Sequence, residues 1–515
     1  MISFLNTPFE SLRKNSKIKY LPWLLAVLTG TLLPLGFAPF HIPGAAILGI
    51  ALFYTQIQKT TRKKAFLLGW LFGLGFLGVG ISWVNISVHT YGHLNLLVSA
   101  GITTLLIFYL ALFPGLCAFA FHCLRQPQTS TLQNCLLFSS LWCLSEYLRA
   151  TVFTGFPWLL IGFGQIDTPL KYLMPIVGVY GVGFLTILAA CCLAQAVNNH
   201  KFYVSWLIAF VVILILPSGL STIHWSRVDN QPISIGIIQA NLSMRDKWDE
   251  RLFWNIIDHY NTHITALMGK HLIVLPESAI PLPASYVHEF LNDIDQQAQK
   301  AGTAVLMGIP EEANHEQTYF YNTLTTLGLA SGSYRKQHLV PFGEYIPHPL
   351  IHLLQWLNLD MSNMQEGQIG QPLTLAHQHP FATLICYELA YPQLLRQQLP
   401  AAQWIVSLSD DGWFGHSLAL YQHLQIAQSL SLLTARYQIV ANNDGLSSII
   451  TSQGHISHEL PAFSAGILEG TIYAATGNTP WVKWGDRPIL SLAMLIILSM
   501  FLQKFIHCFR KDKAH

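Results

Sequence analysis

Apolar residues are distributed unevenly along this chain, and their pattern divides it into two kinds of region. Between residues 20 and 220, and again from 488 to 509, apolar stretches approach the roughly 20 residues that a helix needs to cross a bilayer. We therefore expect a bundle of about eight transmembrane helices. The predicted spans are Leu21–Phe37, Ile42–Ile57, Ala65–Trp83, Leu94–Cys123, Thr131–Leu148, Tyr172–Ala196, Phe202–Leu220 and Pro488–His507.

Residues 225–487 have a different pattern, in which short apolar runs alternate with amphipathic segments. Strands that alternate with helices predict a layered α/β domain. We accordingly expect seven transmembrane helices in 1–224, the α/β domain in 225–487, and the eighth helix with a tail in 488–515. The expected strands are Ile233–Gln239, His271–Leu275, Thr303–Gly308, Thr383–Tyr387, Trp404–Leu408 and Gln438–Ala441; the expected helices are Trp248–Met268, Tyr286–Lys300, which stops at Gly302, and one within Leu418–Ala435.

Charged residues are scarce, at 10% of the chain against about 25% in a typical soluble domain. The net charge is only +2, so nothing in the composition suggests a nucleic-acid partner. Glu146 and Arg149 lie at the end of the fifth predicted span. Charges inside a membrane are costly and are usually paired or functional, and we favour a structural pair near the interface.

The positions of the basic residues predict the orientation in the membrane, because Lys and Arg prefer cytoplasmic loops. They follow the second, fourth, sixth and last spans, whereas His89–His93 and Phe153–Trp158 contain neither. No convincing cleavage site follows the first span, which is therefore expected to be retained. An even number of spans with both termini in the cytoplasm satisfies this pattern and places 225–487 outside. The basic residues are Lys59, Arg62, Lys63, Lys64, Arg125, Lys201, Lys504, Arg510, Lys511 and Lys513.

Cys386 is the only cysteine in the polar region, since the other seven lie in or beside apolar runs. It therefore cannot form a disulfide within its own domain, and an unpaired thiol outside the reducing cytosol is a candidate reactive group. The alternative is a buried core cysteine, the commonest fate of a free thiol. The apolar run before Cys386 is typical of a buried strand whose end would present the thiol.

Two other segments carry groups that a cysteine nucleophile needs. Leu275-Pro-Glu277 ends a predicted strand with a carboxylate, and Tyr334–Pro347 contains Lys336 and Glu344. A nucleophilic thiol needs a base to form the thiolate and a cation or donor to stabilise the oxyanion. Glu277 could serve as the base and Lys336 as the fixed positive charge. The Cys and His residues show no spacing typical of a metal site, and we expect neither a metal nor a cofactor.

The order Glu277, Lys336 and Cys386, in these contexts, resembles the carbon–nitrogen hydrolase (nitrilase) superfamily. The fusion to about eight apolar spans resembles one branch of it, the bacterial apolipoprotein N-acyltransferases. Nearly the whole chain takes part, including Gly155-Phe-Pro-Trp158, Gln239-Ala-Asn241, Lys247-Trp248 and Trp413-Phe-Gly415. Three residues depart from the family pattern: Asp410 where asparagine is usual, Asp444 in a run that usually reads Thr-Asn-Asn-Gly, and Asn478 where arginine is common.

The resemblance implies an αββα sandwich on a helical bundle, in a bacterial inner membrane, with the catalytic domain in the periplasm. It implies transfer of an acyl chain from a phospholipid, usually phosphatidylethanolamine, through a thioester on Cys386 to the α-amino group of a diacylglyceryl-cysteine in an apolipoprotein. Glu277 would be the general base, Lys336 would stabilise the oxyanion, and Glu344 would assist. The residues implied near the substrate are Trp248, Tyr387 and Glu388.

Both substrates are lipids, so access to Cys386 is expected to open sideways to the bilayer under a mobile gate. The apolar segment Leu350–Leu359, which contains Trp356, and the turn Trp413-Phe-Gly415 are the candidates. We expect a monomer in contact with membrane lipids. Two alternatives are a membrane-tethered amidohydrolase, with water as final acceptor, and a transporter or receptor with an outer binding domain, for which charged or broken helices at mid-bilayer would be the sign.

Overall fold

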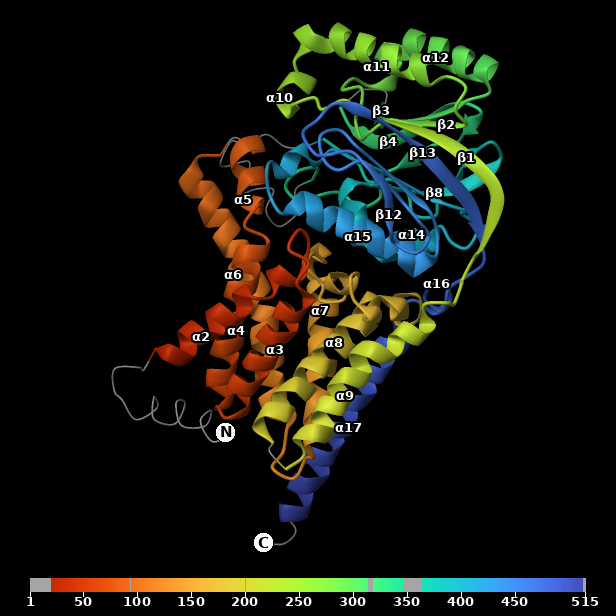
Figure 1. Cartoon of the computed structure of the whole chain (residues 1–515). Helices are drawn as coiled ribbons and strands as arrows, with labels where there is room; N and C mark the ends of the chain where they lie inside the picture. The colour runs from red at the N-terminus through yellow and green to blue at the C-terminus, as the bar shows by residue number, and fades with distance from the viewer. Residues whose placement is uncertain (1–19, 93, 200, 314–317, 346–362, 513–515) are drawn as a thin grey trace.

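The structure is a computed structural model that describes residues 20–92, 94–199, 201–313, 318–345 and 363–512. Long helices form a bundle at one end of the molecule and a layered α/β sandwich forms the other (Figure 1). The sandwich lies in the chain between helix α9 (Tyr203–Ile215) and helix α17 (Arg487–Asp512), which both run along the bundle.

Each predicted span coincides with a helix of the bundle. Among the described residues, five helices are long and apolar enough to cross a membrane. Helix α7 begins with a capping box, in which the Ser130 side chain accepts from the Gln133 backbone and the Gln133 side chain accepts from Ser130. Besides α9 and α17, the bundle helices are α2 (Leu21–Thr31), α3 (Pro43–Gln58), α4 (Arg62–Gly80), the short α5 (Val84–Ile86), α6 (Leu96–Leu124), α7 (Thr131–Arg149) and α8 (Met174–Asn198).

Two sheets form the centre of the sandwich, and each has a parallel core with antiparallel edges. The first has the order β13-β1-β2-β3-β4-β6 and the second the order β12-β11-β10-β9-β8-β7-β5. The first sheet contains β1 (Arg227–Gln239), β2 (Leu272–Val274), β3 (Ala304–Glu312), β4 (Phe320–Gly328), β6 (Tyr334–Arg335) and β13 (Gly466–Thr476). The second contains β5 (Ala330–Ser331), β7 (Thr374–Ala376), β8 (His379–Ile385), β9 (Ile405–Ser409), β10 (Gln438–Asn442), β11 (Ser448–Ile450) and β12 (Ile456–Glu459).

Helices cover both outer faces of the paired sheets, which confirms the predicted layered α/β sandwich. Apolar side chains such as Val274 and Leu408 fill the space between the sheets. Helices α11 (Phe253–Leu267) and α12 (His288–Ala301) cover the first sheet through residues such as Tyr260 and Ile294 (Figure 1). The second sheet is covered by α14 (Pro392–Gln397) and α15 (Ala419–Thr434). The shorter helices are α10 (Met244–Lys247) and α16 (Pro480–Trp484).

Helix α15 lies between the second sheet and the bundle, and almost all of its residues are buried. Gln422 and Gln425 make polar contacts with the bundle: Gln422 donates to the Gly80 carbonyl (3.3 Å), and Gln425 accepts from the Ala38 backbone N–H (3.2 Å). The sandwich therefore sits directly on one end of the bundle.

Several expected element bounds were wrong: β1 begins at Arg227 and β3 ends at Glu312, each several residues beyond the expected bound. Two other differences have a clear local cause. The helix predicted from Trp248 begins at Phe253, because the Asp249 side chain caps a 3-10 turn over Glu250–Leu252. The strand predicted to extend to Tyr387 ends at Ile385, because the backbone turns into a 3-10 helix at the next residue. By contrast, α12 stops as predicted at Gly302, which adopts the left-handed conformation that favours glycine.

Glu146 and Arg149 have a structural role, but their contacts differ from the expected pair. Each binds the loop that follows α7: the Arg149 guanidinium donates to the carbonyls of Phe156 (3.0 Å) and Trp158 (2.6 Å), and Glu146 accepts from the Ile161 backbone N–H (2.9 Å). Among the ion pairs of the described residues, none joins Glu146 to Arg149. The two charges thus stabilise the loop that carries Trp158 at the sandwich end of the bundle.

Candidate active site

Glu277 lies in the turn that follows β2, at the carboxyl end of this parallel strand. Gly308 on β3 makes the turn possible, since a Cβ there would lie 2.4 Å from the Pro276 carbonyl oxygen. The Glu277 carboxylate is buried; Oε1 accepts from the Asn322 side chain (2.7 Å) and Oε2 from the Asp410 backbone N–H (2.9 Å). Burial raises the pKa of Glu277, although the Lys336 ammonium opposes this shift. A carboxylate of raised pKa is suited to accept a proton.

Lys336 directly follows β6, and its side chain is 1% exposed. The ammonium donates to Glu344 Oε1 (2.9 Å) and to Glu277 Oε1 (3.5 Å). Burial lowers the pKa of Lys336, but the two carboxylates outweigh burial and the net shift is upward. Glu344 is held in turn by the Val340 backbone N–H (2.8 Å). Lys336 is therefore a fixed cation between two carboxylates.

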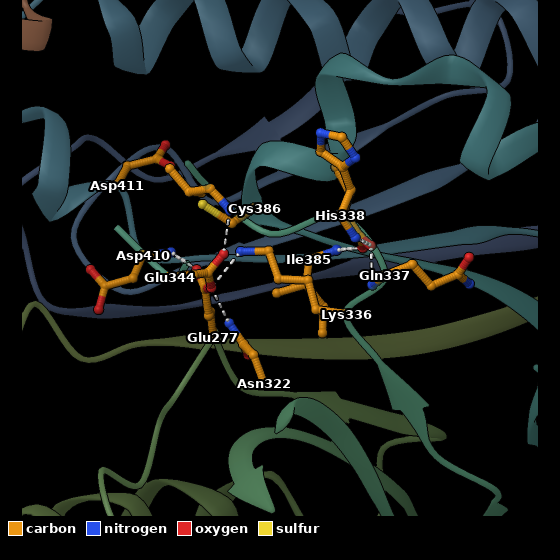
Figure 2. Close-up of polar contacts among 12 residues, drawn as sticks. Glu277, Asn322, Lys336, Gln337, His338, Glu344, Ile385, Cys386, Asp410 and Asp411 are labelled. Carbon is orange, nitrogen blue, oxygen red and sulfur yellow. Dashed lines mark hydrogen bonds and ion pairs between the residues drawn. The ribbon is translucent and has the colours of Figure 1, made fainter. Parts of the chain in front are cut away.

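Cys386 follows the last residue of β8 and adopts a left-handed conformation, with φ of 53°. Its side chain is buried beside Glu277 and Lys336 (Figure 2). Burial raises the pKa of the Cys386 thiol well above its ordinary value; Glu277 adds to this shift and Lys336 opposes it. The resting group is consequently a thiol that needs a base in order to attack. The structure thus brings together Glu277, Lys336, Glu344 and Cys386.

Glu388 lies two residues after Cys386, and its buried carboxylate is surrounded by donors. It accepts from the backbone N–H groups of Ile385 (2.8 Å), Gln337 (2.7 Å) and His338 (3.0 Å), and from the Tyr334 hydroxyl (3.1 Å). These bonds join the strand that precedes Cys386 to the segment that carries Lys336. The contacts of Glu388 favour a role in positioning the segments that carry Cys386 and Lys336.

The aromatic residues expected near the substrate lie at different depths. Tyr387 is buried, and its ring lies nearly parallel to that of Trp158, with centroids 6.5 Å apart. Trp413 is 38% exposed, packs edge-on against Tyr91 (5.1 Å), and accepts at its carbonyl from the Ser87 hydroxyl (2.7 Å).

Two further tryptophans, Trp248 and Trp356, were also predicted near the substrate. Trp248 is 50% exposed and directly follows Lys247. Trp356 and the segment Leu350–Leu359 lie outside the described residues, so their predicted role as a gate stays a prediction.

Three further residues help to hold Glu277 and were not among the predicted site residues. Asn322 donates to both Glu277 and Glu344 Oε1 (3.1 Å to the latter). The Lys247 ammonium donates to the Glu277 carbonyl (3.0 Å) and forms a buried ion pair with Asp410. Lys247 and Asp410 lie in segments that can be compared with the family pattern, whereas nothing in the sequence around Asn322 indicated a role. Its place follows from β4 lying beside β6, where the Lys336 backbone N–H donates to the Asn322 carbonyl (2.8 Å).

No group of three or more His, Cys, Asp or Glu side chains among the described residues is arranged to hold a metal ion. The chemistry that these side chains can perform is nucleophilic attack by a thiol, assisted by a carboxylate base and a buried cation. A set of this kind can form and then break an acyl–thioester bond.

Comparison with known proteins finds a family match for each of the two parts of the chain. Residues 29–192 match the apolipoprotein N-acyltransferase N-terminal domain, and residues 234–479 match the carbon-nitrogen hydrolase family. The yeast protein Nit3, a solved member of branch 10 of the nitrilase superfamily, is 17% identical; the match has a TM-score of 0.36 and covers 47% of this chain and 90% of that chain.

Curated relatives match over almost the full length. The apolipoprotein N-acyltransferase of Coxiella burnetii is 35% identical over 93% of this chain and 99% of its own, and that of Methylococcus capsulatus is 34% identical over 92% and 94%. Because both the bundle and the sandwich take part in these matches, the chain belongs to the apolipoprotein N-acyltransferase family.

Proposed function

We propose that this protein is an enzyme that transfers an acyl chain from a phospholipid to the N-terminal α-amino group of a diacylglyceryl-cysteine in apolipoproteins. The observation that carries the proposal is the buried cluster of Cys386, Glu277 and Lys336 in a chain of this family. Phosphatidylethanolamine is the donor we favour. No cofactor is needed, because thiol, base and cation all come from the chain.

In the first half-reaction, Cys386 Sγ attacks the ester carbonyl of the phospholipid while Glu277 takes the thiol proton. The negative charge that develops on the carbonyl oxygen is stabilised by Lys336, whose described contacts use two of the three ammonium N–H donors and leave one for the oxyanion. The C–O bond then breaks, the lysophospholipid alkoxide takes the proton from Glu277, and the acyl chain remains on Sγ as a thioester.

In the second half-reaction, the neutral α-amine of the apolipoprotein attacks the thioester carbonyl. Glu277 accepts a proton from the attacking nitrogen, the C–S bond breaks, and the proton returns to Cys386 Sγ. The product is an amide, and the kinetics are ping-pong because the first product leaves before the second substrate reacts. Glu344 assists by holding Lys336, and Glu388 by fixing the chain on both sides of the site.

Eight membrane-spanning helices with both termini in the cytoplasm complete the proposal. Residues 1–224 would contain seven helices, 225–487 the periplasmic catalytic domain, and 488–515 the eighth helix with its tail. Lifting an acyl chain out of the bilayer costs about 0.8 kcal/mol per CH₂. A site on the outer end of the bundle avoids most of this cost. Trp248, Tyr387, Trp413 and Trp356 would line the route of the lipids, and a monomer is sufficient.

The thioester provides the test. Purified protein incubated with phosphatidylethanolamine alone is expected to acquire an acyl group on Cys386 that hydroxylamine removes, detectable by mass spectrometry. Adding a diacylglyceryl-cysteine peptide should transfer that group to the peptide amine. Release of free fatty acid in place of the acylated peptide would favour the amidohydrolase alternative. Cys386→Ser should form no thioester, and full transfer by this variant would exclude the covalent route.

A further inference from the structure

His423, on helix α15, contacts the backbone of the proposed nucleophile and is not one of the residues assigned so far. Its Nε2 lies 3.1 Å from the Cys386 carbonyl oxygen, and its Nδ1 lies 3.0 Å from Asp411 Oδ1. The His423 side chain is 2% exposed. A carbonyl oxygen can only accept, so Nε2 carries a proton in this arrangement.

The opposite side of the imidazole also faces an acceptor. The Asp411 carboxylate is 2% exposed, and ionised carboxylate oxygens only accept hydrogen bonds. Both ring nitrogens therefore donate, and His423 is an imidazolium paired with Asp411. Burial lowers the pKa of His423, but Asp411 and the Cys386 carbonyl outweigh burial and raise it.

The carbonyl that His423 holds belongs to a strained turn. Cys386 has φ of 53°, a left-handed conformation that is uncommon for residues other than glycine and persists only where surrounding contacts enforce it. Glu388 holds the residue before the turn through the Ile385 N–H (2.8 Å), and His423 holds the Cys386 carbonyl itself. Freeing that carbonyl would let the turn relax and carry the thiol away from Glu277 and Lys336.

The bundle fixes the plane of the imidazole. The His423 ring stacks on Trp158 with centroids 5.7 Å apart and an interplanar angle of 24°, and it meets Phe414 edge-on at 5.9 Å. Trp158 comes from the loop after α7, and its Nε1 donates to Gln422 Oε1 (2.6 Å), the neighbour of His423. The orientation of the histidine is thus set by a residue of the membrane part of the chain.

We propose that His423 is a positioning residue that holds the Cys386 carbonyl as an imidazolium charged by Asp411, and that Trp158 ties this geometry to the bundle. The inference rests on the proposed function, in which Cys386 is the nucleophile. His423 touches no reacting atom, so its loss should slow acylation of Cys386 without changing how well the phospholipid binds.

Two substitutions of equal length test this role. His423→Gln keeps an N–H donor that can reach the Cys386 carbonyl, whereas His423→Met has no donor; both lose the imidazolium. Thioester formation should be measured in single turnover at several phosphatidylethanolamine concentrations. We expect the Met variant to acylate at least about tenfold more slowly than the Gln variant, at an unchanged half-saturating concentration, because only the Gln variant still satisfies the carbonyl. His122→Met is the matched control, since it removes another buried histidine contact to a backbone carbonyl, Nε2 to Ile57 (2.5 Å).

The outcomes separate the possibilities. Equal acylation rates for the Gln and Met variants, or a loss that only follows the amount of folded protein, would overturn the positioning role. If neither variant folds, Asp411→Asn provides the test of the positioning role. This substitution leaves His423 in place but removes the negative charge of its partner, and we expect acylation of Cys386 to be about tenfold slower. An unchanged rate in that variant would refute the imidazolium. Failure of the wild-type protein to form any Cys386 thioester would refute the proposed function instead.

Discussion

Replacing Asn322 by alanine should change the pH at which this protein becomes active. The Asn322 amide donates to Glu277 Oε1 (2.7 Å) and to Glu344 Oε1 (3.1 Å), so it stabilises the ionised carboxylates. This hydrogen bond lowers the pKa of Glu277 against the upward effect of burial. Removing it therefore raises that pKa further, and the base is charged only at higher pH.

The size of the effect follows from the strength of a hydrogen bond to a charged group. Such a bond contributes about 1.5–3 kcal/mol, and about 1.4 kcal/mol corresponds to a factor of ten in an equilibrium, so its loss should raise the Glu277 pKa and disfavour the charged base by a factor of about 10–100. If deprotonated Glu277 is the base in acylation, the acidic limb of the rate profile moves to higher pH. At a pH below both pKa values the variant should acylate about 10–100-fold more slowly.

The assay is the rate of thioester formation on Cys386, measured across pH with a saturating phospholipid. Thr323→Ala is the matched control, because the Thr323 hydroxyl, one residue along β4, donates to the Glu311 carboxylate (3.3 Å) rather than to Glu277. The control should keep the wild-type profile. An acidic limb that stays in place in Asn322→Ala, or moves to lower pH, would refute either the contribution of Asn322 or the assignment of Glu277 as base.

Three further outcomes are expected. Lys336→Met should reduce thioester formation by at least about two orders of magnitude while the protein stays folded, and normal acylation would exclude its role at the oxyanion. Glu388→Gln should lower the free energy of unfolding by about 1–3 kcal/mol in denaturant titration, because an amide N–H₂ would face donors such as the Ile385 N–H; an unchanged stability would contradict the role of Glu388 in holding the two segments together. A reporter fused after His515 should behave as cytoplasmic and one inserted after Gly302 as periplasmic, and matching signals from both would refute the proposed topology.

The groups proposed to act in catalysis could be identified in the sequence because their surroundings there are distinctive. Cys386 was isolated by being the one thiol in a polar region, and Glu277 by ending an apolar run. Lys336 and Glu344 share one segment whose residues resemble a known family. Each signal is local, since it depends on residues a few positions apart, and local signals can be read without the fold.

Asn322 and His423 could not be found in this way, because their roles depend on neighbours that are distant in the chain. Asn322 meets Glu277 only because β4 pairs with β3 and β6, and the two residues are 45 positions apart. His423 meets Cys386 across 37 positions, through the packing of α15 on the second sheet. Glu388 was predicted near the substrate, but its four hydrogen-bond donors lie in two segments that only the fold brings together.

The sequence by itself determined the two-part organisation, because the length and periodicity of apolar runs set which segments can cross a bilayer and which form strands and amphipathic helices. It also determined which reactive groups are available, since a thiol, a carboxylate or an ammonium belongs to a single residue. The tertiary structure alone decided how these groups interact. Burial raises the pKa values of Cys386 and Glu277, Lys336 remains charged between two carboxylates, and Trp158 reaches the site from the bundle. These effects depend on distance and on exclusion of water, which the folded chain creates by bringing remote segments together.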